Sequence, residues 1–83
     1  MIGKAIDEDS LRLLLSQHAV TEARITRVEG REGRWCLSVR LGGQASRMIL
    51  LRSKREPIRS WASLDSLVRF AHSVGLTELV LEL

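Results

Sequence analysis

Hydrophobic and polar positions follow two periods along this chain, one typical of helices and one typical of strands. Near the N-terminus, a spacing of i, i+3, i+4, i+7 predicts one buried helical stripe, made of Leu11, Leu14, Leu15 and His18. Asp7 or Asp9 can cap this helix, because a carboxylate accepts hydrogen bonds from the free N–H groups at a helix start. The first element is therefore predicted to be a short helix.

Strand patterns come next. The segment EARITRVEG (22–30) is rich in β-branched residues and ends at a glycine, and RWCLSVRLGG (34–43) alternates strictly. That alternation places four hydrophobic residues on one face, namely Trp35, Leu37, Val39 and Leu41. Residues 29–34 are typical of a hairpin loop, and Gly42 and Gly43 of a tight turn into the strand SRMILLR (46–52). Hairpins join antiparallel strands, so these segments are predicted to form a three-stranded meander.

The C-terminal part predicts a second helix and a last strand. Pro57 ends any strand pairing because it has no N–H to donate. Ser63 is the expected N-cap, with Trp61 covering the first turn, and Gly75 suits the left-handed position that closes a helix. The apolar stripe of this helix comprises Leu64, Leu67, Val68, Ala71 and Val74. The final TELVLEL (77–83) alternates as a fourth strand.

These elements predict a single α+β domain over residues 1–83, in the order α-β-β-β-α-β. The second helix is long enough for a crossover, so the fourth strand should run parallel to the third. It can pair beside either the third strand or the first. Both helices are expected to cover the face of Trp35, Leu37 and Val39, which gives a two-layer sandwich.

The opposite sheet face is expected to be unusually apolar. If Met48 and Leu50 point inward, then Ile49 and Leu51 point outward, and Val80 does the same from the last strand. Cys36 lies on that outer face too. Such a face suits a dimer or partner surface. The alternative is that the N-terminal helix covers it and makes a third layer.

Composition places the chain among ordinary soluble proteins. It has 83 residues, 45% hydrophobic and 28% charged, which allows one hydrophobic core. No apolar run approaches the ~18 residues of a membrane span, and MIGKAIDEDS (1–10) lacks the apolar region of a signal peptide. The single Cys36 cannot form an intramolecular disulfide. A cytoplasmic location and no membrane partner are therefore expected.

Positive charge is concentrated in one part of the chain. The net charge is +3, and the basic residues of 47–59 stand against Glu56 alone; we call them the basic stretch, made of Arg47, Arg52, Lys54, Arg55 and Arg59. Acidic residues gather instead at 7–9 and near the C-terminus. A basic patch favours anionic partners. A solvated connection between two core elements is the alternative.

Catalytic chemistry is not indicated. Cys36 sits between hydrophobic residues in a strand, and His18 and His72 have no carboxylate beside them in sequence, so all three are interpreted as structural. One cysteine and two distant histidines supply no metal spacing. LGGQ (41–44) is not a phosphate-binding loop, because no Lys-Ser/Thr follows it. No enzyme activity and no cofactor are expected.

Nucleic-acid binding is a second hypothesis. The basic stretch could contact phosphates, with Arg24, Arg27 and Arg40 adding charge on the sheet. However, no helix-turn-helix or zinc-finger pattern is visible, and the second predicted helix carries only Arg69 as a basic residue. Any DNA contact would be weak and independent of sequence.

Short motifs over residues 10–83 resemble a known family. These are Gly33-Arg34-Trp35 before an alternating strand, the basic residues of 52–59, Arg59-Ser60-Trp61 with Leu64-Asp65, and Gly75-Leu76 before the last strand. The pattern is similar to that of small ParC-type partition-associated proteins, which are carried by plasmids and integrative elements. The resemblance implies a non-enzymatic accessory protein of a mobile element, involved in maintenance or its regulation. It implies no catalytic residue and no particular binding site.

Three functional hypotheses follow. The first is an accessory protein that binds another protein, such as a partition ATPase or a regulator, through Arg52, Lys54, Arg55, Arg59, Trp61, Ile49 and Leu51. Charge reversal at Arg55 and Arg59 should then weaken binding without unfolding the domain. The second is a DNA-binding accessory that uses the basic stretch. The third is a homodimer formed through the outer sheet face.

Overall fold

The N-terminal helix α1 (Glu8–Ser16) begins after Asp7, one of the two caps that the sequence predicts. In the computed structural model, which describes residues 5–83, Asp7 is its N-cap and the carboxylate accepts a hydrogen bond from the Ser10 N–H at 2.9 Å. The prediction that His18 continues the buried stripe was wrong. Backbone hydrogen bonds from Gln17 close the helix, and His18 turns the exposed chain toward the next strand with a φ of 58°.

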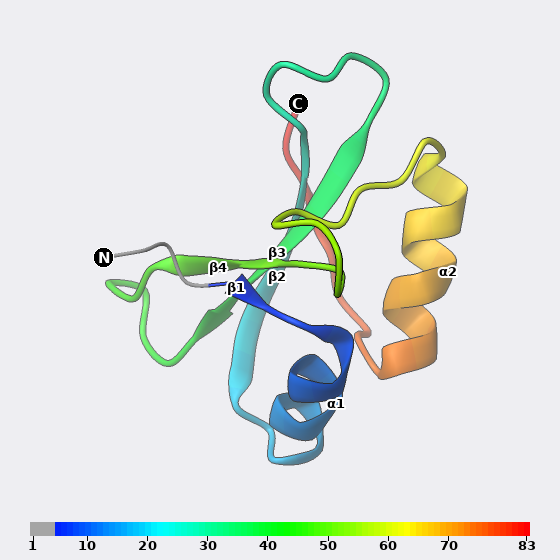
Figure 1. Ribbon diagram of the computed structural model, residues 1–83. Coiled ribbons are helices and arrows are strands. Elements are labelled where there is room, and N and C mark those ends of the chain that lie inside the picture. The colour runs from blue at the N-terminus through cyan, green and yellow to red at the C-terminus, as the bar shows by residue number, and fades with distance from the viewer. Residues whose placement is uncertain (1–4) are drawn as a thin grey trace.

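The sheet has five strands in the order β1-β4-β3-β2-β5 (Figure 1). The antiparallel neighbours are β2 (Val20–Arg27), β3 (Trp35–Leu41) and β4 (Met48–Leu51). At one edge, β1 (Ala5–Ile6) pairs parallel with β4, an element that the sequence did not predict. At the other edge, β5 (Val80–Leu81) pairs parallel with β2, which is one of the two placements left open. The mixed sheet and two helices confirm the α+β class.

The second helix, α2 (Leu64–Val74), has the predicted ends. The Ser63 hydroxyl accepts a hydrogen bond from the Ser66 N–H at 3.3 Å. Gly75 closes the helix with a φ of 111°, a conformation that a residue with a Cβ adopts only under strain. Leu76, which follows, is buried. Serine and glycine thus set the length of the helix.

One hydrophobic core lies between the sheet and the helices. Leu11 of α1 and Leu67, Ala71 and Val74 of α2 pack in the same cluster as sheet residues that alternate along their strands. Those sheet residues define the inner face, which comprises Ala23, Ile25, Leu37, Val39 and Leu51. The residues between them in sequence define the outer face, which includes Arg24, Cys36, Ser38 and Leu50.

The structure corrects the orientation of Ile49 and Leu51. Ile49 is paired with Val39 and packs on the core, and Leu51 is 2% exposed, so both lie on the inner face. A tight turn at Gly42 and Gly43 would have placed Met48 opposite Leu37. Instead the strands are joined by residues 42–47, and the longer connection exchanges the two faces of β4.

Two further expectations concern the whole chain. Neither helix within residues 5–83 has the length and apolar character that a bilayer crossing requires. The first four residues of MIGKAIDEDS, where no signal peptide was expected, lie outside the described residues.

Candidate functional site

The basic stretch does not form one patch in space. Arg47 precedes β4 and Arg52 follows it, so the strand separates these two side chains. At about 3.3 Å per strand residue, their backbones lie on the order of 16 Å apart. Arg47 therefore does not join the other basic residues.

Residues 52–58 form a closed loop, which we call the basic loop. The Arg59 N–H donates to the Leu51 carbonyl at 2.9 Å, so the two ends of the loop meet. Inside the loop, the Ser53 N–H donates a hydrogen bond to the Glu56 carbonyl, and the Glu56 N–H donates one to Ser53 Oγ. The Arg52 N–H also donates to the Ile6 carbonyl at 2.8 Å. Compact loops with such closed ends hold their side chains in place and frequently carry function.

Arg52, Lys54 and Arg55 are exposed on this loop. The structure gives no ion pair to any of the three among residues 5–83, and Arg52 Nε donates to the Ser53 carbonyl. These cations remain available to a partner.

Arg59 and Trp61 have a different role, since both are built into the fold. The Arg59 guanidinium lies 4.4 Å from the ring centre of Phe70 and 5.0 Å from that of Trp61, and it donates to the Glu8 carboxylate at 3.1 Å. Trp61 packs on Phe70 with ring centres 5.2 Å apart. Arg59 therefore connects α1, α2 and the segment just before α2, and its charge is already paired with Glu8.

Two of the motifs that carry the resemblance meet in space. Trp35 and Trp61 exchange backbone N–H to carbonyl bonds of 2.9 Å in both directions. Arg34 donates to both the hydroxyl and the carbonyl of Ser60. This pairing fixes the segment before α2 against the start of β3. The contact between Arg34 and Ser60 was not predicted, because nothing in a single sequence shows which residues of separate motifs touch.

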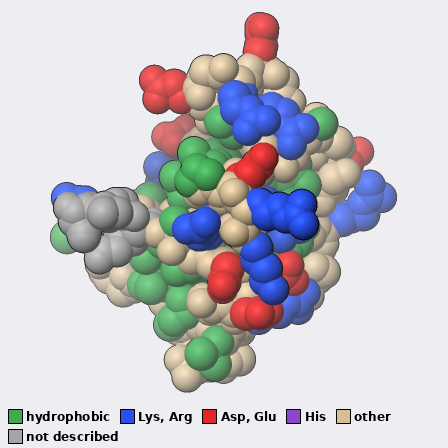
Figure 2. Space-filling view, viewed as in Figure 1, with side chains coloured by type: hydrophobic (Ala, Val, Ile, Leu, Met, Phe, Trp, Pro, Cys, Tyr) green, Lys and Arg blue, Asp and Glu red, His purple; other side chains and the backbone are tan. Residues whose placement is uncertain are grey.

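Acidic residues of the N-terminus lie beside the basic loop. Asp7, Glu8 and Asp9 line one hollow of about 320 Å³ together with Arg52, Ser53, Lys54 and Arg59. Figure 2 shows Lys and Arg side chains intermixed with Asp and Glu on the face it presents. The surface at the basic loop is therefore one of mixed charge.

Hydrogen bonds and nearby cations lower the pKa values of Asp7 and Glu8. Hydrogen bonds from the Ser10 backbone and side chain hold the pKa of Asp7 below its usual value, and the nearby Lys54 ammonium adds to this. The pKa of Glu8 is lowered by its hydrogen bonds from Arg12 and then from Arg59. Both groups are thus carboxylates at neutral pH.

The arginines of the sheet do not extend the basic loop. On the outer face, Glu22 accepts hydrogen bonds from Arg24 and Arg40, and these lower its pKa. Arg24 also lies 3.5 Å from Glu82. Arg27 stacks over Trp35, with its guanidinium 4.6 Å from the ring centre. Arg24 and Arg40 are brought together by Glu22, which pairs with both, and Arg27 lies over Trp35 instead, so the three do not form a phosphate-binding row.

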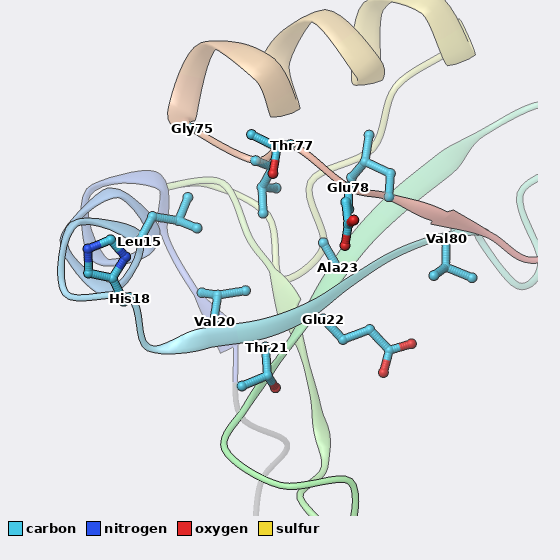
Figure 3. Close-up of a pocket in the computed structure, with 12 residues that line it drawn as sticks. Leu15, His18, Val20, Thr21, Glu22, Ala23, Gly75, Thr77, Glu78 and Val80 are labelled. Atoms are coloured by element: carbon cyan, nitrogen blue, oxygen red, sulfur yellow. The ribbon is translucent and has the colours of Figure 1, made fainter.

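An open groove of about 820 Å³ lies at the C-terminal end of α1 (Figure 3). It separates the start of β2 from the segment after α2, and Leu15, Val20, Ala23 and Leu76 give it an apolar part. Several polar groups at the groove are already engaged. The Thr21 hydroxyl donates to the Gly42 carbonyl at 2.7 Å, and Glu22 is bound by the two arginines. The groove shows no arranged nucleophile and base.

The remaining candidates for chemistry stay apart. Cys36 is 5% exposed on the outer face, where its thiol lies 3.4 Å from the Thr26 hydroxyl. His72 is exposed in the last turn of α2, where a positive charge suits the negative end of the helix. Within residues 5–83, no three His, Cys, Asp or Glu side chains are grouped as metal ligands.

No family model, curated protein or solved structure matches the chain.

Proposed function

We propose that this chain is a non-enzymatic accessory protein that binds another protein through the basic loop. The resemblance described above suggests the setting, which is the maintenance of a plasmid or other mobile element in the cytoplasm. The partner would then be a partition ATPase or a regulator of partition. In this proposal the domain is a two-layer sandwich, and the basic loop lies at one end of β4.

One observation favours a protein over nucleic acid as the partner. Asp7, Glu8 and Asp9 share a hollow with Arg52, Lys54 and Arg59, so cations and carboxylates alternate on the same surface. A phosphate backbone is uniformly negative, and it would meet the carboxylates wherever it reached the cations. A protein surface can present both signs of charge, so that each group finds its complement.

The contact is assigned to fewer residues than the sequence suggested. Arg52, Lys54 and Arg55 are exposed on a loop whose backbone is already fixed, so binding would order little new chain. Arg59 and Trp61 are already engaged inside the fold, Arg59 by Glu8 and Trp61 by Phe70. Ile49 and Leu51 face the core, so they are not part of the proposed contact surface.

Affinity capture with matched variants tests this proposal. The bait is the purified chain, presented to a lysate of the cells that carry its gene. The test variant is Lys54→Glu/Arg55→Glu, and the control is Arg31→Glu/Arg47→Glu, which changes the net charge equally on exposed residues elsewhere. We expect a protein that wild type and control retain and the test variant loses.

The eluate also decides between the two classes of partner. Protein identification and DNA sequencing are both applied to it. Identical protein eluates from the two double variants would contradict the proposal. DNA retained by wild type and lost only by the test variant would favour the alternative, a DNA-binding accessory.

A further inference from the structure

The strand β5 leaves one edge of the sheet open. It pairs with β2 on one side, and among residues 5–83 no strand pairs with its other side. The Glu82 N–H donates to the Ile25 carbonyl at 2.9 Å, so residue 82 faces β2. Backbone groups alternate along a strand, and the N–H and C=O groups of Leu81 and Leu83 therefore face the open side.

Of the features that usually prevent strand addition, this edge has a short strand, Val80–Leu81, and one acidic side chain, Glu82, but no blocking proline or basic residue. Residues 79–83 contain no Pro, Lys or Arg. Three of their hydrophobic side chains are exposed: Val80 at 47%, Leu81 at 46% and Leu83 at 85%. An open edge with exposed apolar side chains is a template for another strand.

The alternation of side chains selects one register for pairing with a second copy. When Leu81 lies opposite its own counterpart, Leu79 meets Leu83 and Val80 meets Glu82 of the other copy. Leucines then adjoin leucines on the inner side, and the outward backbone groups of 79, 81 and 83 all find partners.

Neighbouring registers with the same backbone pattern are opposed by charge. A shift that places Val80 opposite itself sets Glu78 against Glu82 twice. The opposite shift places Glu82 against its own counterpart. Like charges directly opposite each other destabilise a strand pair, so of these three registers only the one centred on Leu81 avoids both conflicts.

We propose that two copies of this chain associate through antiparallel pairing of β5, with a two-fold axis at Leu81. The sheets of the two copies then form one continuous sheet. This inference does not depend on the function of the basic loop. Only Val80 and Leu81 form a strand in the single copy, so residues 79, 82 and 83 would extend it on pairing. Such a short pairing buries a small area, so we expect a weak dimer, with a dissociation constant between about 1 μM and 1 mM.

Sedimentation velocity over a range of concentrations tests the proposal. We expect the weight-average sedimentation coefficient of the wild type to rise with concentration. Leu81→Lys places two positive charges together on the axis, and Leu81→Pro removes an N–H that the β2 pairing does not use, so each should give a monomer. Leu13→Lys is the matched control, because Leu13 is 57% exposed on α1, and it should dimerise as the wild type does. Far-UV circular dichroism verifies that each variant is folded.

A charge-exchange experiment tests the register itself. Leu81→Lys and Leu81→Glu should each be monomeric alone and should associate when mixed, because the two-fold axis brings residue 81 of one copy against residue 81 of the other. A wild type that stays monomeric at millimolar concentration overturns the proposal. So does a dimer that persists in the folded Leu81→Lys and Leu81→Pro variants.

Discussion

At the scale of single residues, Arg59 shows how a basic side chain can serve the fold rather than a partner. Its guanidinium lies over Phe70 and Trp61 and bonds to Glu8, so one side chain contacts both helices and the segment between them. The earlier expectation that reversing its charge would spare the fold no longer follows. Arg55, four residues earlier, has no such contacts among the described residues.

Replacing Arg59 should therefore destabilise the domain. Arg59→Ala removes a partly exposed ion pair and two stacking contacts, which together should lower the free energy of unfolding by about 1–2 kcal/mol. Arg55→Ala should change it by less than about 0.5 kcal/mol. Urea denaturation of both variants measures the difference. Equal stability of the two variants would show that the contacts of Arg59 contribute nothing.

At the scale of elements, the sequence predicts the helices better than the sheet. Asp7, Ser63 and Gly75 act through residues within a few positions of themselves, so local rules placed both helix starts and the end of α2. The faces of β4 depended on the length of one connection. Residues 42–47 are held there by Arg40, which donates to the carbonyls of Gln44 and Ser46.

The candidate site was predictable only in part for the same reason. The exposed cations Arg52, Lys54 and Arg55 follow from their place between a strand and a helix. That Asp7 to Asp9 lie beside them depends on β1 pairing with β4, and a strand of two residues leaves no pattern in the sequence. Contacts between segments far apart in the chain carry no local signal.

The Glu22 carboxylate pairs with Arg24 of β2 and Arg40 of β3, so the stability of the domain should depend on pH. Hydrogen bonds from Arg24 and Arg40 lower its pKa in the folded state, so the unfolded chain binds a proton more readily than the folded one. The stabilisation that the ionised Glu22 gives the fold is complete above the pKa of Glu22 in the unfolded chain. It is lost as the pH falls through the lower pKa of Glu22 in the folded state.

Urea denaturation between about pH 6 and pH 3 tests this linkage, a range that spans the ordinary glutamate pKa of about 4.3. The free energy of unfolding should fall with pH in the wild type and fall less in Glu22→Gln. The control is Glu32→Gln, on the exposed hairpin loop, and it should keep the wild-type profile. An equal acid-induced loss in Glu22→Gln would contradict the assigned role of Glu22.

At the scale of the whole molecule, the distribution of charge favours one of the proposed functions over the other. The net charge of +3 suggests a weak general affinity for nucleic acid. In the folded chain the basic residues do not act together. Arg24 and Arg40 are paired with Glu22 on the outer face, Arg59 is paired with Glu8, and Arg47 lies apart. The basic loop that remains has carboxylates beside it. We therefore expect this mixed surface to suit a protein partner and to oppose DNA.

Titration of the wild type, Asp9→Lys and Lys54→Glu/Arg55→Glu against a fluorescent duplex DNA tests this claim most directly. At about 0.15 M salt, we expect no saturable binding of the wild type up to about 100 μM, the weak limit of ordinary non-specific affinity. Asp9→Lys removes one carboxylate from the hollow and adds a cation, so it should bind more tightly than the wild type when the salt is lowered. Micromolar binding of the wild type, abolished by Lys54→Glu/Arg55→Glu, would contradict the account and assign the basic loop to DNA.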